Sequence, residues 1–366
     1  MKIYLVGGAV RDILLDIAPK DKDWVVIGTN EKEMLALGFK KVGSSFPVFI
    51  HPDTKEEYAL ARKEKKIGKG YYGFETTFDK SVTLEDDLLR RDLTINSIAM
   101  TDKGEIIDPF NGAQDIKKRI LRHTSLAFTE DSLRVIRIAR FKAQLSDFNF
   151  KIAKETEELC IKIANSGELI DIKKERINIE FIKSLKNPKI FFNSLKTLHG
   201  LEILFPLIRQ QFSKLPRKIF FISDTYQKSN IETKIALTFF SFAPKDINKL
   251  KTELCLTNNQ SKIIHATCCL FQISKTVSHD EILFLLKQSN ILRNNILLQK
   301  TKIIMGKLKE LKNLNNLEDK INSTFETISE LLKLNYSDAF SKTSHTDKNM
   351  LAKTLQLNII KKHFKL

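Results

Sequence analysis

Two aspartates stand one residue apart at the start of an apolar run. Asp21 and Asp23 open the stretch DKDWVVIG, residues 21–28. Alternate side chains of a β-strand share one face, which sets the two carboxylates roughly 7 Å apart at their Cα atoms. Such like charges are costly without a cation between them, and Mg²⁺ takes one or two carboxylates together with waters and substrate phosphates. The spacing predicts a magnesium site, with two solvated aspartates at a strand start as the alternative.

A glycine turn precedes this pair. In VGGAVRD, residues 6–12, a strand is expected to end, Gly7 and Gly8 to turn, and a helix carrying Arg11 to begin. Glycines let backbone N–H groups approach an anion, and a helix N-terminus favours negative charge. The sequence is neither G-x-G-x-x-G nor a Walker A loop, which disfavours standard dinucleotide-binding and P-loop folds. It indicates a phosphate-binding turn or, alternatively, an ordinary strand-to-helix turn.

A third cluster lies in LEDDLLRRDLTINS, residues 84–97. Arg90, Arg91, Asp92 and Asn96 are expected together at the end of a helix. The Arg91 guanidinium can bind phosphate, and the oxygens of Asp92 and Asn96 suit the hydroxyls of a ribose. A salt-bridged helix surface would use the same residue types. We interpret the cluster as part of a nucleotide site.

The fourth cluster is TEDSLRVIRIARF, residues 129–141. Thr129 is expected to cap a helix on which Arg134, Arg137 and Arg140 follow at steps of three and share one side. Asp131 and Arg134 are neighbours at i, i+3. A solvated charged stripe is the alternative. Because arginine, unlike lysine, offers a rigid donor fork, the stripe favours contacts with phosphates or bases.

Two kinds of segment must position these clusters. Residues 1 to about 110 mix short strand-like runs with glycine turns and two helices, one of them beginning near Thr83 in a T-L-E-D capping pattern. From about residue 115 the glycines nearly vanish, and apolar residues recur at helical spacing to the end of the chain. The sequence therefore predicts an α/β head followed by a long helical part.

The bulk composition narrows the class of partner. The 366 residues carry 61 Lys and Arg against 44 Asp and Glu, a net charge of +17 that favours a polyanion such as nucleic acid. The four cysteines form no C-x-x-C pair, which is typical of reduced cytosolic thiols. We see neither a signal peptide nor the ~20 consecutive apolar residues of a membrane helix. A cytoplasmic protein without a membrane partner is expected.

The four clusters, in this order, resemble the motifs of bacterial CCA-adding enzymes, the class II tRNA nucleotidyltransferases of the DNA polymerase β nucleotidyltransferase superfamily. Residues 42–75 and the stretches ERINIEFIKSL and LHGLEILFP also resemble this family. The resemblance is dense over residues 1 to about 210 and thin afterwards. It implies an α+β fold, in which a nucleotidyltransferase head with a mixed sheet precedes an all-α neck, body and tail. The implied divisions are a head at 1–110, a neck at 111–145, a body at 146–225 and a tail at 226–366.

The resemblance also assigns roles by position. Asp21 and Asp23 would bind Mg²⁺, with Glu57 as a further catalytic carboxylate. The nucleotide-binding residues would be Gly8, Arg11, Arg91, Asp92, Asn96, Asp131, Arg134, Arg137 and Arg140, with Asp131 and Arg134 reading the base. Residues 63–75 resemble a flexible loop linked to the switch from C to A addition. The implied substrates are CTP, ATP and the acceptor and T arms of tRNA, bound by a monomer.

Three alternatives stay open. A bacterial poly(A) polymerase shares the head motifs, but this chain has FPVFIHP where such enzymes usually carry an Arg-rich stretch. An enzyme that adds only A or only CC is a second possibility, and a catalytically silent RNA-binding protein is a third. Some relatives carry an HD phosphohydrolase domain. Here the one His-Asp pair is His279-Asp280, so we expect no such activity and a shortened or degenerate tail.

Overall fold

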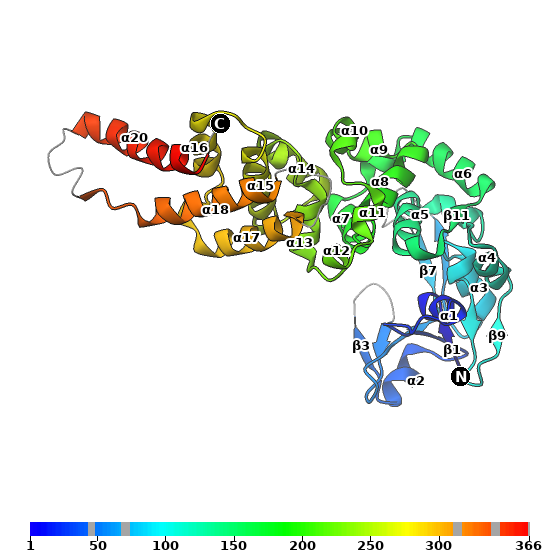
Figure 1. The fold of residues 1–366 in the computed structure, drawn as a ribbon. Coiled ribbons are helices and arrows are strands. Elements are labelled where there is room, and N and C mark those ends of the chain that lie inside the picture. Colours follow the sequence, from blue (N-terminus) through cyan, green and yellow to red (C-terminus); the bar gives the residue numbers. More distant parts are fainter. Residues whose placement is uncertain (43–47, 67–73, 310–316, 338–344, 365–366) are drawn as a thin grey trace. The chain divides into compact units, whose positions relative to one another are not determined.

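The chain divides into two compact units in its computed structural model, which describes residues 1–42, 48–66, 74–309, 317–337 and 345–364. The first unit comprises Met1–Arg176 and Ile190–Leu204, and the second comprises Ile177–Lys189 and Phe205–Leu366. In Figure 1 the last strand along the chain is β11, Lys151–Ile152, and the ribbon after it is drawn with helices and connections alone. An N-terminal α/β region followed by helices is the organisation predicted from the sequence.

A mixed sheet forms the centre of the head. Among the described residues its strands run in the order β3-β4-β5-β2-β1-β8-β9. Their bounds are β1 Lys2–Val6, β2 Asp23–Ile27, β3 Lys40–Val42, β4 Val48–Ile50, β5 Glu57–Leu60, β8 Ala99–Met100 and β9 Ile106–Ile107. The β2–β5 pair is parallel, whereas the other neighbours are antiparallel. Separate two-stranded pairs join β6 Lys63–Lys66 to β7 Phe74–Thr77 and β10 Ile120–Leu121 to β11 Lys151–Ile152.

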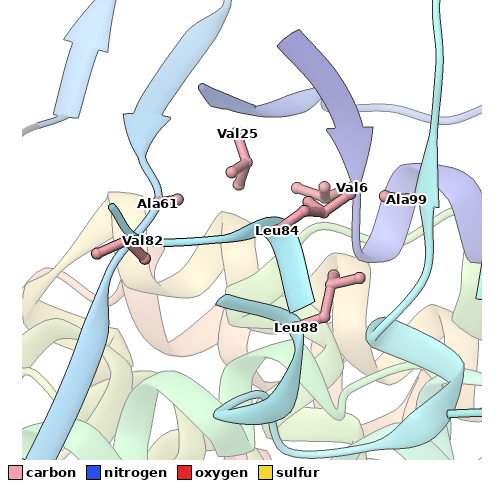
Figure 2. Packing of buried hydrophobic residues seen from close by; sticks show 7 residues of the cluster. All are labelled: Val6, Val25, Ala61, Val82, Leu84, Leu88 and Ala99. Atoms are coloured by element: carbon pink, nitrogen blue, oxygen red, sulfur yellow. The ribbon is translucent and has the colours of Figure 1, made fainter. Parts of the chain in front are cut away.

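The apolar run of β2 contributes side chains to both faces of this sheet, because successive side chains of a strand point to opposite faces. Val25 joins a core on one face and Val26 a core on the other. The first core also holds Val6, Leu84 and Leu88, and Figure 2 shows these side chains together between the strands and α3, Leu84–Leu89. The run WVVI is therefore apolar throughout because β2 is covered on both sides.

Short helices connect the strands of the head. They are α1 Gly8–Leu14, α2 Glu31–Ala36, α3, the 3-10 turn η1 Thr94–Asn96 and α4 Gly112–Lys118. The predicted capping pattern is confirmed at α3, where the Thr83 side chain accepts from the Asp86 backbone N–H and the Asp86 carboxylate accepts from that of Thr83. The cap fixes the start of α3, and its C-terminal end leads directly into Arg90 and Arg91.

The remainder of the first unit is helical apart from β10 and β11. Its elements are η2 Leu126–Glu130, α5 Leu133–Gln144, η3 Ser146–Phe148, α6 Lys154–Asn165, η4 Glu168–Asp171 and α9 Leu201–Leu204, while α7 Lys174–Lys183 and α8 Pro188–Thr197 are shared between the two units. The prediction that Thr129 caps the arginine helix is wrong. Thr129 lies in η2, and α5 begins only at Leu133, after Asp131 and Ser132.

The second unit is entirely helical in its described residues. Its elements are α10 Pro206–Gln210, η5 Phe212–Lys214, α11 Lys218–Phe221, α12 Asp224–Gln227, α13 Ile231–Phe239, η6 Pro244–Asp246, α14 Ile247–Leu254, α15 Asn258–Ile273, α16 His279–Gln288, η7 Ile291–Arg293, α17 Asn295–Lys309, α18 Leu317–Lys333 and α20 His345–His363. Helix α15 packs against α13, α14, α16, α17 and α18, and buries Ile264 and Leu270 among them. No helix in the described part of the chain is long and apolar enough to cross a membrane.

Candidate active site

The carboxylates singled out in the sequence lie at one end of β2. Asp23 is the first residue of this strand, and its neighbour across the parallel β2–β5 pair is Glu57, the first residue of β5. Paired residues of adjacent strands point to the same face. Asp21 lies two residues before the strand, so the expectation that β2 itself carries both aspartates is wrong. All three side chains are exposed.

The donor set at this end of the sheet fits Mg²⁺ bound by two carboxylates. Asp21 and Asp23 offer hard oxygen ligands, and Mg²⁺ commonly completes its shell with waters and substrate phosphates. Among the residues that the structure describes, no group of three or more His, Cys, Asp or Glu side chains is arranged to hold a metal ion. Glu57 therefore adjoins Asp23 without completing such a group.

The turn between β1 and α1 leaves no room for a side chain at its first glycine. Gly7 has φ +71°, a conformation that L residues rarely adopt. A Cβ built on Gly7 would lie 2.7 Å from Nη1 of Arg91, which approaches the turn from the end of α3. Arg91 is held there by the buried Asp87 carboxylate, at 3.0 Å from its Nη2. Two clusters far apart in the sequence thus meet at the glycine turn.

A chain of hydrogen bonds joins α1, η1 and α5. Arg11, which is 6% exposed, donates from Nη1 to Oδ1 of Asn96 at 2.8 Å. The Asn96 side-chain amide donates in turn to Oδ1 of Asp92 at 3.0 Å. Arg137 of α5 donates from Nε to the other Asp92 oxygen at 2.7 Å. Four residues predicted for the nucleotide site are therefore consecutive partners in one network.

The Asp92 carboxyl is held as an anion by this network. Burial raises its pKa, but the charges of Arg137 and Arg140 and the Asn96 hydrogen bond outweigh burial, so the pKa lies well below its usual range. An ionised carboxylate accepts hydrogen bonds only. Asp92 is thus a permanent acceptor at neutral pH, which suits a partner bearing hydroxyl groups.

The depressed Asp92 pKa predicts a pH-dependent contribution to stability. Because the folded-state pKa is lowered, the contribution is complete above the unfolded pKa of about 3.9 and is lost as the pH falls through the folded value. At pH 7 we expect Asp92→Asn to lower the free energy of unfolding by about 3 kcal/mol, since it breaks a buried pair.

This difference between Asp92→Asn and the wild type should shrink below about pH 4. Urea unfolding of both proteins at several pH values between 7 and 3 measures it. Asp53→Asn removes an exposed carboxylate of the same unit and should show no such trend. A difference that stays constant over this pH range would contradict the proposed ionisation.

Residues absent from the sequence prediction hold η1, and with it Asn96, in place. The Thr94 hydroxyl donates to the buried Asp115 carboxylate at 2.8 Å, and Arg122 donates from Nε to the same oxygen at 3.1 Å. A Cβ built on Gly112 would lie only 2.1 Å from the Thr94 carbonyl oxygen. Helix α4 therefore approaches η1 as closely as a glycine permits. The D-P-x-N-G pattern at residues 108–112 marks a turn, but not its contact with η1.

This close approach predicts a large effect for one methyl group. Gly112→Ala must push α4 and η1 apart, because the new Cβ meets backbone atoms that cannot rotate away. We expect the free energy of unfolding to fall by about 1–3 kcal/mol, and binding of CTP to weaken through displacement of Asn96. Urea unfolding and calorimetric titration with CTP measure the two effects. Gly306→Ala, at a helical glycine where no atom lies within 4 Å of the new Cβ, separates this clash from the general effect of replacing a glycine in a helix.

The two residues predicted to read the base are engaged with other groups in the structure. The Asp131 carboxylate accepts from both terminal nitrogens of Arg176, at 2.7 Å to Oδ2 and 3.4 Å to Oδ1. Arg134 donates to the backbone carbonyls of Ala127 and Arg90, at 2.8 and 2.7 Å. Asp131 lies two residues before α5, and Arg134 is the second residue of that helix. Arg176, 45 residues from Asp131, had no signal in the sequence that linked it to this carboxylate.

The remaining arginine of the α5 stripe turns toward the helix itself. Arg140 is 6% exposed, its guanidinium carbon lies 3.6 Å from the centre of the Phe141 ring, and its Nη1 donates to Gln144. Its charge, like that of Arg137, lowers the pKa of the Asp92 carboxyl. The stripe therefore contains two arginines whose charges favour the ionised Asp92, and Arg137 also donates a hydrogen bond to it.

Two further sequence predictions concern the loop at residues 63–75 and the His279-Asp280 pair. Within the loop predicted at residues 63–75, residues 67–73 lie outside the described part of the chain. The two residues of the His-Asp pair have different partners. His279 Nε2 lies 2.9 Å from the Phe364 carbonyl oxygen, and Asp280 forms an ion pair with Lys353. These contacts tie α16 to α20.

Two family models match successive segments of the chain. The Poly A polymerase head domain matches residues 3–122, and the model described as the probable RNA and SrmB-binding site of polymerase A matches residues 149–212. The first match covers Asp21 and Asp23, the glycine turn and the Arg91–Asn96 cluster. Fold and site together define a nucleotidyltransferase head followed by a helical region.

Curated relatives narrow this class. The CCA-adding enzyme of Francisella tularensis subsp. novicida (strain U112) is 54% identical over 296 residues, which are 80% of this chain and 80% of that protein. This chain belongs to the family of CCA-adding enzymes, which confirms the resemblance seen in the sequence. The multifunctional CCA protein of Pseudoalteromonas atlantica (strain T6c / ATCC BAA-1087) is 56% identical over 207 residues, which are 56% of this chain and 51% of that protein.

A solved structure shows the same fold. The Bacillus stearothermophilus CCA-adding enzyme in complex with CTP superposes with a TM-score of 0.65, at 23% identity, over 99% of this chain and 89% of that chain. The likeness confirms the predicted α+β class, with a mixed-sheet head and helices after it.

Proposed function

We propose that this chain completes and repairs the 3′ end of tRNA by adding C, C and A from CTP and ATP without a template, releasing pyrophosphate. The network that runs from Arg11 through Asn96 and Asp92 to Arg137, beside the Gly7 turn, is the observation that carries this proposal. It gathers phosphate-binding and hydroxyl-binding groups at one place in a member of the CCA-adding enzyme family.

Asp21 and Asp23 would hold Mg²⁺ at the end of β2. In a two-metal mechanism, one bound Mg²⁺ would lower the pKa of the attacking tRNA 3′-hydroxyl, and a second would stabilise charge on the triphosphate and its leaving group. The protein contributes a rigid edge for the two carboxylates, because β2 is covered on both faces by the two cores. In-line attack on the α-phosphorus would then proceed from a fixed geometry.

The nucleotide would bind between the glycine turn and the network. Gly8, Arg11 and Arg91 lie where a triphosphate would meet backbone N–H groups and two guanidinium groups. Asn96 and the permanently ionised Asp92 would receive the ribose hydroxyls. Because Arg11 and Arg137 already hold Asn96 and Asp92 in place, the site needs little reordering to accept a sugar.

Asp131 and Arg134 would select the base. Cytosine and adenine both present an exocyclic amino donor beside a ring nitrogen acceptor, which suits a carboxylate beside a guanidinium. Uracil and guanine present a carbonyl at the first position and would be repelled by Asp131. One pair of side chains can thus accept C and A and reject U and G without a nucleic-acid template.

The helices that follow the head would bind the acceptor and T arms of tRNA. Residues 205–366 hold twice as many lysines and arginines as aspartates and glutamates, so most of the excess positive charge of the chain lies there. Such a surface binds RNA by shape and phosphate contacts rather than by sequence. We also propose that the chain is divided into a head, a neck, a body and a tail. We further propose that it acts as a monomer in the cytoplasm.

The proposal is tested by incubating the full chain with tRNA that lacks its 3′ end, CTP, ATP and Mg²⁺, and by reading product lengths at single-nucleotide resolution. We expect addition to stop after three nucleotides. A long A tail would instead indicate a poly(A) polymerase, and arrest after two nucleotides would indicate a CC-adding enzyme. Addition of a single A to tRNA ending in CC, without addition to shorter ends, would indicate an A-adding enzyme.

Glu57 is expected to matter less than the two aspartates. Its carboxylate adjoins Asp23 across the sheet but does not complete a three-carboxylate group. Because it would act on the metal only through its charge, we expect Glu57→Gln to slow CTP addition by roughly tenfold, about 1.4 kcal/mol of barrier. Single-turnover rates measure this. Loss as complete as that of Asp21→Ala would instead make Glu57 a direct metal ligand.

A further inference from the structure

The second unit contains a cavity of about 410 Å³ that the proposed reaction does not use. It lies between η5, the segment joining α13 to η6, helix α15 and the start of α16. All residues that line it belong to the second unit, whereas all the residues of the candidate active site belong to the first. The volume falls within the range of about 300–1,000 Å³ that small-molecule sites occupy.

The inner wall of the cavity is apolar. It is formed by Phe242, Cys268 and Phe271, which are 2%, 1% and 4% exposed. Burial raises the pKa of the Cys268 thiol well above its ordinary value, so it stays neutral, and its Sγ lies 3.3 Å from the Phe239 carbonyl oxygen. A wall of two phenylalanines and a neutral thiol suits a flat ring rather than a charged group.

Two ammonium groups from different elements stand at the edge of the cavity. Lys214 belongs to η5 and donates to the Gln211 side chain at 3.1 Å, while Lys275 follows α15 and its Nζ lies 4.4 Å from the centre of the Phe271 ring. Both lysines are exposed. The described lining holds a single carboxylate, Glu281, which accepts from the Thr276 hydroxyl. The edge is therefore net positive and suits an anionic group.

Further polar side chains lie in the lining. The Gln272 side-chain amide can both donate and accept hydrogen bonds, and the Glu281 carboxylate can accept from an amino group. The apolar wall suits the face of a ring, Gln272 and Glu281 suit its polar edge, and the two lysines suit a phosphate. We propose that this cavity binds a nucleoside monophosphate, either free or as an unpaired nucleotide of an RNA.

Calorimetric titration of the full chain with AMP tests this site. The titration is made in an Arg91→Gln background, which weakens the nucleotide site of the head. We expect one binding event, which the further pair Lys214→Gln and Lys275→Gln weakens at least tenfold. Lys249→Gln with Lys262→Gln removes the same charge from exposed lysines of the same unit outside the cavity, and should change affinity less than twofold. Thermal unfolding checks that all variants are folded.

Competition experiments identify the source of the ligand. If tRNA displaces AMP from the control protein, the cavity takes a nucleotide of the RNA, and if tRNA leaves AMP bound, it takes the free mononucleotide. The proposal is overturned by absence of AMP binding in the Arg91→Gln background or by equal weakening in both lysine pairs. It is also overturned if inorganic phosphate competes as well as AMP does, because the ring would then contribute nothing. None of these outcomes depends on whether the chain adds CCA.

Discussion

Replacing either aspartate of the D-x-D pair should abolish nucleotide addition while leaving tRNA binding intact. Asp21→Ala and Asp23→Ala each remove a ligand from a site whose metal stabilises the transition state by several kcal/mol, so the rate of CTP addition should fall on the order of 10³-fold or more. Both side chains are exposed, Asp23 as the first residue of β2 and Asp21 two residues before it, so the core should persist. The affinity for tRNA should stay within about twofold, because the tRNA contacts are proposed to lie on the helices after the head.

The measurement pairs single-turnover addition with filter binding of the same tRNA. Asp53→Ala removes an exposed carboxylate from the head without touching β2 and serves as the matched control, with near wild-type rates expected. The dependence of the residual rate on Mg²⁺ concentration gives a second readout, since loss of a ligand should shift it to higher concentration. Wild-type rates in Asp21→Ala would contradict the metal assignment outright.

Local features of the fold could be predicted from the sequence because neighbouring residues determine them. The Thr83 cap, the glycine turn after β1 and the buried β2 follow from residue type and short-range spacing. The helix that carries Arg134 and Arg137 was also predicted, but its start was not. Thr129 has the residue type of a cap, yet the chain forms η2 first and α5 begins four residues later.

Long-range pairings could not be predicted in this way. Glu57 adjoins Asp23 because β5 pairs with β2 in parallel, and the intervening β3 and β4 extend the sheet beyond β5. Nothing in local spacing sets that register. The contact of Gly112 with Thr94 is equally hidden, because a glycine after Asn reads as a turn residue whatever lies against it. Residue types alone indicate the candidate site, whereas the contacts that support it appear only in the structure.

Arg176 is the support with the clearest functional consequence. Its guanidinium holds the Asp131 carboxylate from the start of α7, and the Leu133 backbone N–H donates to Asp131 Oδ1 at 3.1 Å. Asp131 is thereby fixed in direction beside a cation. A carboxylate that is proposed to repel uracil and guanine needs such a fixed direction. We therefore treat Arg176 as a positioning residue for nucleotide selection.

Asp131→Ala should relax nucleotide choice more than it affects any other property. Removing the carboxylate abolishes both the acceptor for the amino group of C and A and the repulsion of U and G, so the preference for CTP over UTP should fall about 100-fold or more. The ratio of kcat/KM for the two nucleotides on tRNA lacking CCA measures it, with tRNA affinity unchanged within about twofold. If UTP and GTP stay excluded, Asp131 does not read the base.

Arg176→Gln should change selection in the same direction but by less, about tenfold, because Asp131 remains but is free to turn away. Lys174→Gln removes an exposed cation from the same helix and should leave the CTP to UTP ratio as in the wild type. In the double variant Asp131→Ala with Arg176→Gln, selection should be no worse than in Asp131→Ala alone, since Arg176 acts through that carboxylate. Additive losses would show that Arg176 contacts the nucleotide or the tRNA itself. If Arg176→Gln and Lys174→Gln changed the CTP to UTP ratio equally, the cause would be a general loss of positive charge, and Arg176 would not position Asp131.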